Sequence, residues 1–467
     1  MAVFPSAIQT AVRSICAHID SRPETTPFFR TLARLGVVNA DPSKPPICTA
    51  DELHYVTVHN SDWRLALWRY KPPRKAPPRN HPLVLLSGVG TNAIGFDLSP
   101  GSSFARYMSS QGFDTWILEV RGAGLSTKGM RIMEGRKPTH AISEQIDSTI
   151  DHYKNGLREA EGNSVIDGHI ADLGQSIMDV TEKGQRYVSS QFIDLQDHFS
   201  PRIEDFQTLL GLKVKYDWDF DHYLEEDVPA AMAYIRTKCK PKDDKLLAVG
   251  HSMGGILLYA MLSRSGFDGR DSGLASVITL GSSLDYTTSK SSLKFLLPLA
   301  DPAQALNVPL IPLGALLAAA YPLAVRPPYI LSWLNSQISA ENMMHPELFE
   351  KLILNNFCNI PTKLLVQLTT AFQGGGLCDR SRSFFYKDHL HKIKVPTLAL
   401  AGDQDLICPP EAVYETAKLI PRDLVTFKVF GEPGGPHYGH YNLVGGYAAT
   451  DQVYPCIIEF LSLHDTA

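Results

Sequence analysis

Residues 249–255 read Val-Gly-His-Ser-Met-Gly-Gly, a Gly-x-Ser-x-Gly pattern that lies between two apolar segments. The segment Leu246–Val249 before it is typical of a buried strand, and the segment Ile256–Leu262 after it is typical of a helix. A strand that turns directly into a helix needs glycine beside the serine, because a Cβ at the flanking positions would not fit the turn. The pattern therefore predicts that Ser252 stands on a sharp, strained turn with its hydroxyl raised out of the sheet.

The composition limits the class of protein. The chain has 467 residues, of which 44% are hydrophobic and 20% charged, as in ordinary globular proteins. The formal net charge of −5 and the lack of a basic block exclude an obvious nucleic-acid partner. The seven scattered cysteines form no C-x-x-C pair, which argues against a disulfide framework and a zinc site and favours a reducing compartment. We expect neither a cofactor nor a bound metal.

Two segments bear on the location of the protein. The first twenty residues lack a basic start and a long apolar stretch, so we predict a cytoplasmic protein that is not secreted. Because no acidic residue precedes Asp20, import into a plastid or another organelle stays open. The segment Pro302–Val325 is uncharged, but its four prolines would break a spanning helix, so we expect it to be buried or interfacial.

Strand-like and helix-like segments alternate along most of the chain, which predicts an α/β fold with a mostly parallel central sheet and helices on both faces. Besides the strand before Ser252, the expected strands are Leu53–Val58, Arg64–Tyr70, Leu83–Leu86, Thr115–Val120, Ala275–Leu280, Thr397–Ala401 and Val425–Val429. Besides the helix after Ser252, the expected helices are Ser103–Gln111, Tyr223–Thr237, Glu411–Leu419 and Asp451–Leu463.

Two long segments do not fit this alternation, and we predict that they are helical insertions into one core. The core comprises residues 51–283 and 391–467, and residues 1–50 form an N-terminal arm. The first insertion, at about 125–215, carries an amphipathic helical pattern; a helix packed on the core is favoured over one that binds a partner. The second, at 284–390, is apolar and rich in proline in its first half, and we predict a cap or lid.

An activated serine needs a base that takes its proton and an acid that orients the base. Two aspartates follow the strand expected at Thr397–Ala401. Asp405 is favoured over Asp403 as the acid, because a carboxylate close to a strand end often only caps a turn. Two histidines follow the last expected strand. His440 is favoured over His437 as the base, because the glycine before it leaves its ring free to reach the serine.

A serine of this kind also needs two backbone N–H groups that stabilise a negatively charged oxygen. Met253, the residue after the serine, is expected to supply one of them. The loop Ser87–Gly90, which follows a predicted strand, is expected to supply the other from Val89, with Gly90 as the alternative. A plain turn is the other interpretation of the glycines in this loop.

Three stretches carry a resemblance to a known family: Ser103–Arg121, Trp218–Ala230 and Gly250–Gly255. With the loops of Asp405 and His440 they resemble the α/β-hydrolase superfamily, specifically its lipase and esterase branch, which contains the acid lipases. The Ser252 turn equally resembles those of monoacylglycerol lipases and of serine aminopeptidase-like hydrolases. The resemblance implies an α/β-hydrolase fold in which Ser252 is the nucleophile, Asp405 the acid and His440 the base.

The chain departs from that branch at two positions. Ser87 stands where the branch usually has a histidine, and Asn442 stands where it usually has an aspartate. In addition, His222 and Asp227 match an H-x-x-x-x-D pattern that some acyltransferases of the superfamily carry. Because this pattern falls on a predicted helix, we expect a structural role for it.

These observations predict a serine hydrolase that cleaves carboxylic esters, with a small hydrophobic ester or lipid as its substrate. The apolar runs of the second insertion suit such a substrate and allow peripheral contact with a membrane. The alternatives are a binding protein on the same fold, an amide or peptide hydrolase, and an acyltransferase. The sequence makes no prediction of the oligomeric state.

Overall fold

The computed structural model describes residues 47–59, 61–99, 101–128, 216–294, 310–327, 329 and 331–466. The chain divides into two units, Met1–Pro42 and Ser43–Ala467, and every described residue belongs to the second unit. The predicted N-terminal arm lies outside the described residues except for its last few positions. The predicted first insertion from residue 129 onward and the segment 295–309 also lie outside them.

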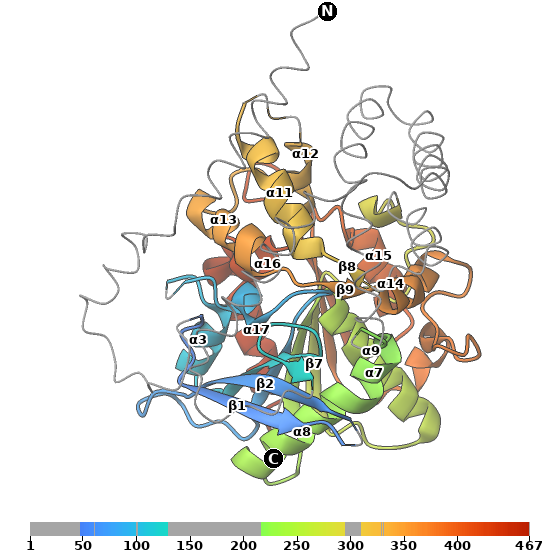
Figure 1. Ribbon diagram of the computed structural model, residues 1–467. Coiled ribbons are helices and arrows are strands. Elements are labelled where there is room, and N and C mark those ends of the chain that lie inside the picture. Colours follow the sequence, from blue (N-terminus) through green and yellow to red (C-terminus); the bar gives the residue numbers. More distant parts are fainter. Residues whose placement is uncertain are drawn as a thin grey trace, which may run out of the picture. The chain divides into compact units, whose positions relative to one another are not determined.

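A twisted sheet forms the centre of the second unit (Figure 1). It has nine strands, in the order β1-β2-β4-β3-β6-β7-β10-β11 and with β5 paired to β2. Its strands are β1 (Glu52–Thr57), β2 (Trp63–Tyr70), β3 (Leu83–Leu86), β4 (Thr115–Glu119), β5 (Thr127–Lys128), β6 (Leu246–His251), β7 (Leu274–Leu280), β10 (Thr397–Gly402) and β11 (Val425–Phe430). All neighbours from β4 to β11 are parallel, whereas β1, β2 and β5 pair antiparallel. The predicted mostly parallel sheet is confirmed.

The strands β3, β4, β6 and β10 are buried along their whole length. Because successive side chains of a strand point to opposite sides, both faces of this central part of the sheet are covered. In β6, Leu246 and Ala248 belong to one apolar core and Leu247 and Val249 to the other. Helices α8 (Val228–Cys239), α9 (Met253–Asp268) and α15 (Pro410–Ala417) contribute to the first core. Helices α3 (Phe104–Ser110), α16 (Asn442–Gly445) and α17 (Ala449–Leu463) contribute to the second.

The described part of the second insertion is largely helical. It contains β8 (Leu310–Ile311), α11 (Leu313–Val325), α12 (Trp333–Ile338), α13 (Pro346–Asn355), β9 (Ile360–Pro361), α14 (Thr362–Thr369) and η5 (Thr370–Phe372), and the chain returns to the core through η6 (Tyr386–Lys392). Strands β8 and β9 pair antiparallel, and α11 packs against α12 and α13 (Figure 1).

Three details differ from the sequence-based expectations. The expected helix at 223–237 is divided into α7 (Phe220–His222), a wide π-turn η3 (Tyr223–Asp227) and α8. Pro322 lies inside α11, which continues for three more residues to Val325. The first insertion was expected to begin at about residue 125, yet β5 at 127–128 still pairs with the sheet.

A buried histidine connects three distant parts of the core. The ring of His81 is fully enclosed, and its Nδ1 and Nε2 each lie 2.9 Å from a carboxylate, of Asp465 and Asp243 respectively. Carboxylates only accept hydrogen bonds, so both ring nitrogens donate and the ring carries a positive charge. The hydrogen bond to Asp465, reinforced by Asp243, raises the pKa of His81 in spite of its burial.

We predict a pH-dependent contribution of His81 to stability. A pKa that is higher in the folded than in the unfolded chain stabilises the fold fully below the unfolded value of about 6.5. This stabilisation is lost as the pH rises through the higher, folded value. The substitution His81→Gln should therefore lower the free energy of unfolding by about 1.5–3 kcal/mol at acidic pH and by clearly less at alkaline pH. Urea unfolding at several pH values measures this, with the exposed His391→Gln as control. A loss that is the same at every pH would contradict the prediction.

Candidate active site

Ser252 forms the whole of the turn between β6 and α9. It has φ 56° and ψ −122°, a left-handed backbone conformation that costs a residue other than glycine about 1–3 kcal/mol. A Cβ on Gly250 would lie 2.4 Å from the carbonyl carbon of Gly254, and a Cβ on Gly254 would lie 2.0 Å from the carbonyl oxygen of Leu86. Only glycine fits at both positions. The Ser252 side chain makes no capping bond to α9, so its hydroxyl is available for chemistry.

A buried aspartate and a buried histidine pair beside this turn. Asp405 Oδ2 lies 2.7 Å from His440 Nδ1, and both side chains are almost completely enclosed. The other carboxylate oxygen, Oδ1, accepts the N–H groups of Ile407 at 2.9 Å and Cys408 at 2.8 Å. Three hydrogen bonds thus fix the carboxylate of Asp405 and, through it, the plane of the imidazole.

The pairing decides which nitrogen of His440 carries the proton. A carboxylate accepts, so Nδ1 donates to Asp405. In the neutral imidazole the second nitrogen, Nε2, is then unprotonated and can act as a base. This is the tautomer that a histidine must have to take a proton from a serine hydroxyl.

The competing candidates pair with each other rather than with Ser252. Asp403 Oδ2 lies 2.5 Å from His437 Nδ1, and Asp403 Oδ1 accepts the N–H of Tyr438 at 2.8 Å. Both side chains are partly exposed, at 23% for Asp403 and 38% for His437. This outer pair connects the same two loops as the buried pair, but it lies closer to solvent.

Several contacts join the serine turn to the buried pair. The N–H of Ser252 donates to the carbonyl of Leu280 at the end of β7. A Cβ on the next residue, Gly281, would lie 2.8 Å from Asp405 Oδ2 and 3.1 Å from His440 Nδ1. Among the described residues, no direct hydrogen bond joins the Ser252 hydroxyl to His440. Such bonds are often long in the absence of substrate and tighten when it binds.

His251, directly before the serine, is in contact with His440. Its Nε2 donates to the backbone carbonyl of His440 at 3.0 Å, and the two rings lie 4.6 Å apart. Burial, together with the neighbouring His440, lowers the pKa of His251 to about 3. His251 is therefore neutral and does not compete with His440 for a proton.

The predicted oxyanion loop lies against the serine. A Cβ on Gly88 would be 3.2 Å from Ser252 Cβ and 3.6 Å from its hydroxyl oxygen. Within the described part of the chain, the N–H groups of Val89 and Met253 have no hydrogen-bond partner. The loop carbonyls, in contrast, are engaged: Gly88 accepts the hydroxyl of Thr91 at 2.8 Å, and Gly90 accepts the N–H of Cys358 at 2.7 Å.

Sequence reasoning missed two supporting residues. Ser282 donates its hydroxyl to the backbone carbonyl of Ser252 at 2.7 Å. It lies two residues after the strand β7, and this position at the carboxyl end of a parallel strand was a signal that could have found it. Asn442 is completely buried, accepts the N–H of Gly439 at 2.8 Å and of Ala340 at 2.7 Å, and so joins the His440 loop to the second insertion.

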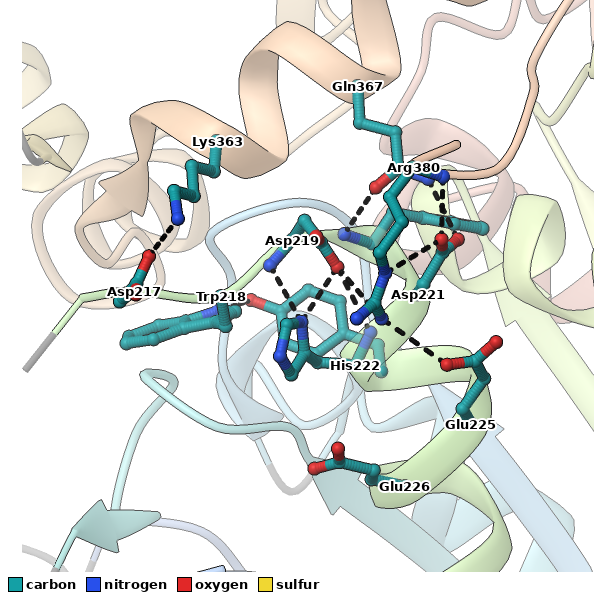
Figure 2. Close-up of polar contacts among 12 residues, drawn as sticks. Asp217, Trp218, Asp219, Asp221, His222, Glu225, Glu226, Lys363, Gln367 and Arg380 are labelled. Atoms are coloured by element: carbon teal, nitrogen blue, oxygen red, sulfur yellow. Dashed lines mark hydrogen bonds and ion pairs between the residues drawn. The ribbon is translucent and has the colours of Figure 1, made fainter. Parts of the chain in front are cut away.

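His222 and Asp227 belong to separate networks, neither of which includes Ser252. Figure 2 shows His222 beside Asp219, with 2.7 Å between its Nδ1 and the carboxylate, and Arg380 approaches the same carboxylate at 3.3 Å. Asp227 instead accepts the backbone N–H of Arg121 at 2.8 Å and its Nε at 2.9 Å. His222 thus takes part in the N-terminal cap of α7, and Asp227 binds the end of the π-turn to Arg121. Both contacts agree with a structural role.

A family model described as the alpha/beta hydrolase fold matches residues 81–442. The chain belongs to the α/β-hydrolase family. The match spans the serine turn, both Asp–His pairs and the whole of residues 284–390. No protein of curated function matches the chain.

Solved structures of this family are similar to the chain at low identity. An esterase from Thermogutta terrifontis is 15% identical with a TM-score of 0.44, covering 89% of this chain and 100% of its own. A monoacylglycerol lipase from Paleococcus ferrophilus is 14% identical with a TM-score of 0.42, covering 85% and 99%. A soluble variant of monoglyceride lipase from Saccharomyces cerevisiae is 12% identical with a TM-score of 0.47, covering 92% and 100%.

The described ranges contain neither a membrane-spanning helix nor a metal-binding cluster. None of the helices there has the length and apolar character needed to cross a bilayer. The same residues contain no group of three or more histidine, cysteine or acidic side chains arranged to hold a metal ion.

We predict that His222→Ala leaves the reactivity of the serine within about twofold of the native value, because His222 contacts neither Ser252 nor the buried pair. The rate of labelling by a fluorophosphonate probe measures this reactivity, and circular dichroism checks that the variant folds. A folded variant that reacts more slowly by about tenfold or more would assign His222 to the chemistry instead.

Proposed function

We propose that this chain is a serine hydrolase that cleaves carboxylic esters through an acyl intermediate on Ser252. The observation that carries the proposal is the buried pair of Asp405 and His440 beside the strained serine turn. The Asp405 carboxylate is buried and is held by two backbone N–H groups in addition to His440. It is well suited to hold one tautomer of a histidine and to stabilise its charged form.

In the proposed reaction, His440 Nε2 takes the proton of the Ser252 hydroxyl while the oxygen attacks the ester carbonyl. The N–H groups of Val89 and Met253 stabilise the negative oxygen of the tetrahedral intermediate. His440 then gives its proton to the leaving alcohol, and the acyl group stays on Ser252. Water, activated by the same nitrogen, releases the acid and restores the serine. Asp405 accepts the hydrogen bond from His440 Nδ1 throughout.

We propose that the acyl group is hydrophobic, and that residues 284–390 form the cap that contacts it. Helix α11 contains no charged residue, and only Ala324 of its thirteen residues is buried. Leu316 is 39% exposed and Trp333 of the adjacent α12 is 48% exposed. An apolar helix at a protein surface favours contact with a lipid-like substrate or with the surface of a membrane. In this proposal the core comprises residues 51–283 and 391–467.

Labelling with a fluorophosphonate probe tests the reaction type. We expect the native protein to be labelled and Ser252→Ala not to be labelled, because the probe reacts only with an activated serine. A panel of p-nitrophenyl esters with acyl chains of increasing length then tests the substrate class, and we expect the medium and long chains to be preferred. A folded native protein without labelling or turnover would contradict the proposal and favour a binding protein on the same fold.

The two Asp–His pairs give a matched test of the acid. We predict that Asp405→Asn lowers kcat by about 10³–10⁴-fold, because an asparagine holds the wrong tautomer of the histidine. Asp403→Asn should leave kcat within about threefold, because the hydrogen-bond partners of its carboxylate in the described part of the chain are His437 and the N–H of Tyr438, not His440. Steady-state kinetics on one ester measure both variants. If Asp403→Asn were the damaging change, the assignment of the two pairs would be reversed.

A further inference from the structure

Asn356 is a buried polar residue of the second insertion that the proposed reaction does not use. It follows α13 directly, its N–H donates to the carbonyl of Leu352 at 3.1 Å, and its side chain is completely enclosed. A buried carboxamide stabilises a fold only where its donors and acceptor all find partners. The partners of Asn356 lie in two segments of the core: the segment that follows the proposed oxyanion loop, and the loop of His440.

The first partner is the segment that continues the oxyanion loop. Asn356 Oδ1 accepts the N–H of Gly95 at 2.9 Å, and its backbone carbonyl accepts the N–H of Asn92 at 3.0 Å. A Cβ on Gly95 would lie only 3.2 Å from Asn356 Oδ1, so the two segments are in close contact. These bonds fix the segment that runs from Val89 to η1 (Ala93–Phe96).

The residues after Asn356 extend this contact. Phe357 forms an isolated antiparallel bridge with Thr91, and Cys358 donates its N–H to the carbonyl of Gly90 at 2.7 Å. A Cβ on Gly90 would lie 2.6 Å from the side chain of Ile360. The insertion therefore lies along the whole of residues 90–92 and limits how far the Val89 N–H can move.

The second partner is the loop of the proposed base. Asn356 Nδ2 donates to the phenol oxygen of Tyr441 at 3.1 Å, and Tyr441 is the residue after His440. The Tyr441 ring is buried between Phe357 and His251, with ring centroids 6.1 Å and 4.8 Å away. Burial raises the pKa of Tyr441, so the phenol stays neutral and can accept this bond.

We propose that Asn356 is a positioning residue: one carboxamide of the insertion fixes the oxyanion loop through Gly95 and the base loop through Tyr441. Its oxygen and its nitrogen act on the two loops separately, so the distance between the Val89 N–H and His440 depends on this side chain. The inference rests on the proposed function. It adds that the second insertion contributes to the arrangement of the catalytic groups and does not only cover the substrate.

The variant Asn356→Ala tests the inference, with the neighbouring Asn355→Ala as control. The Asn355 side chain is exposed and donates only to the carbonyl of Lys351 in its own helix. A small soluble ester is the substrate, and end-point titration with a fluorophosphonate counts the active sites. We expect Asn356→Ala to lower kcat per titrated site by about 10–100-fold with KM within about threefold, because displaced catalytic groups slow the chemical step. Asn355→Ala should match the native protein.

A second variant covers the case in which Asn356→Ala folds poorly. Tyr441→Phe removes only the phenol oxygen, and we expect it to lower kcat per site by about 3–10-fold. Its control is Tyr259→Phe, which removes a buried phenol that contacts the hydroxyl of Thr279 at 2.7 Å. Where the double variant is obtained, it should be no slower than Asn356→Ala alone, because both changes remove the same bond.

The outcomes separate the inference from the proposed function. Unchanged kcat per titrated site in Asn356→Ala and Tyr441→Phe, with only fewer active sites or a lower melting temperature, would overturn the positioning role and leave the proposed function intact. The same holds if the control variants lose as much kcat as the test variants. A native protein that neither reacts with the probe nor turns over esters would overturn both, since there would be no reaction to position.

Discussion

The strained turn at Ser252 is the constraint on which the rest of the site depends. A serine with φ 56° is unfavourable on its own, and it persists only where its surroundings determine the backbone completely. Here the sheet supplies that support. The N–H of Ser252 donates to the carbonyl of Leu280 in β7, and the carbonyl of Ser252 accepts the hydroxyl of Ser282. The glycines on either side of Ser252 carry no side chain, so α9 can begin in close contact with β3. The packed core thus holds the hydroxyl of Ser252 in a position that a flexible loop would not maintain.

The parallel sheet also explains why groups far apart in the sequence meet at this turn. The carboxyl ends of parallel strands lie at one edge, and β3, β6, β7 and β10 are consecutive neighbours. The oxyanion loop, Ser252, Gly281 and Asp405 each follow one of these strands, so they meet without any specific pairing between their sequences. Two Asp–His pairs lie side by side at this same edge of the sheet. Burial distinguishes them, since the pair of Asp405 and His440 is enclosed and the outer pair is partly open to solvent.

Much of this arrangement could be predicted from the sequence, because it depends on local patterns. The buried strands, the Gly-x-Ser-x-Gly turn and the order of the candidate residues are all properties of short segments. The roles of His251, Asn442 and Asn356 could not be predicted in this way. Each depends on a contact between segments about 80 to 260 residues apart, and a lone asparagine after a helix carries no local signal. The π-turn before α8 was missed for the same reason, since its last residue, Asp227, accepts hydrogen bonds from the distant Arg121.

These long-range contacts change how the second insertion relates to the core. A cap that only covered a substrate would touch the rim of the site and could vary without effect on the chemistry. In this chain the segment after α13 instead lies along residues 90–92 of the proposed oxyanion loop and its continuation, and Ala340 donates its N–H to Asn442 in the loop of His440. A displacement of the insertion would therefore move hydrogen bonds on both sides of Ser252. In the proposed reaction, substrate contact with the apolar helix α11 would be linked to the geometry of the proposed catalytic groups through α13, which packs against α11, and Asn356, which follows α13. A ligand that favours one placement of these helices would then also favour one arrangement of the proposed site.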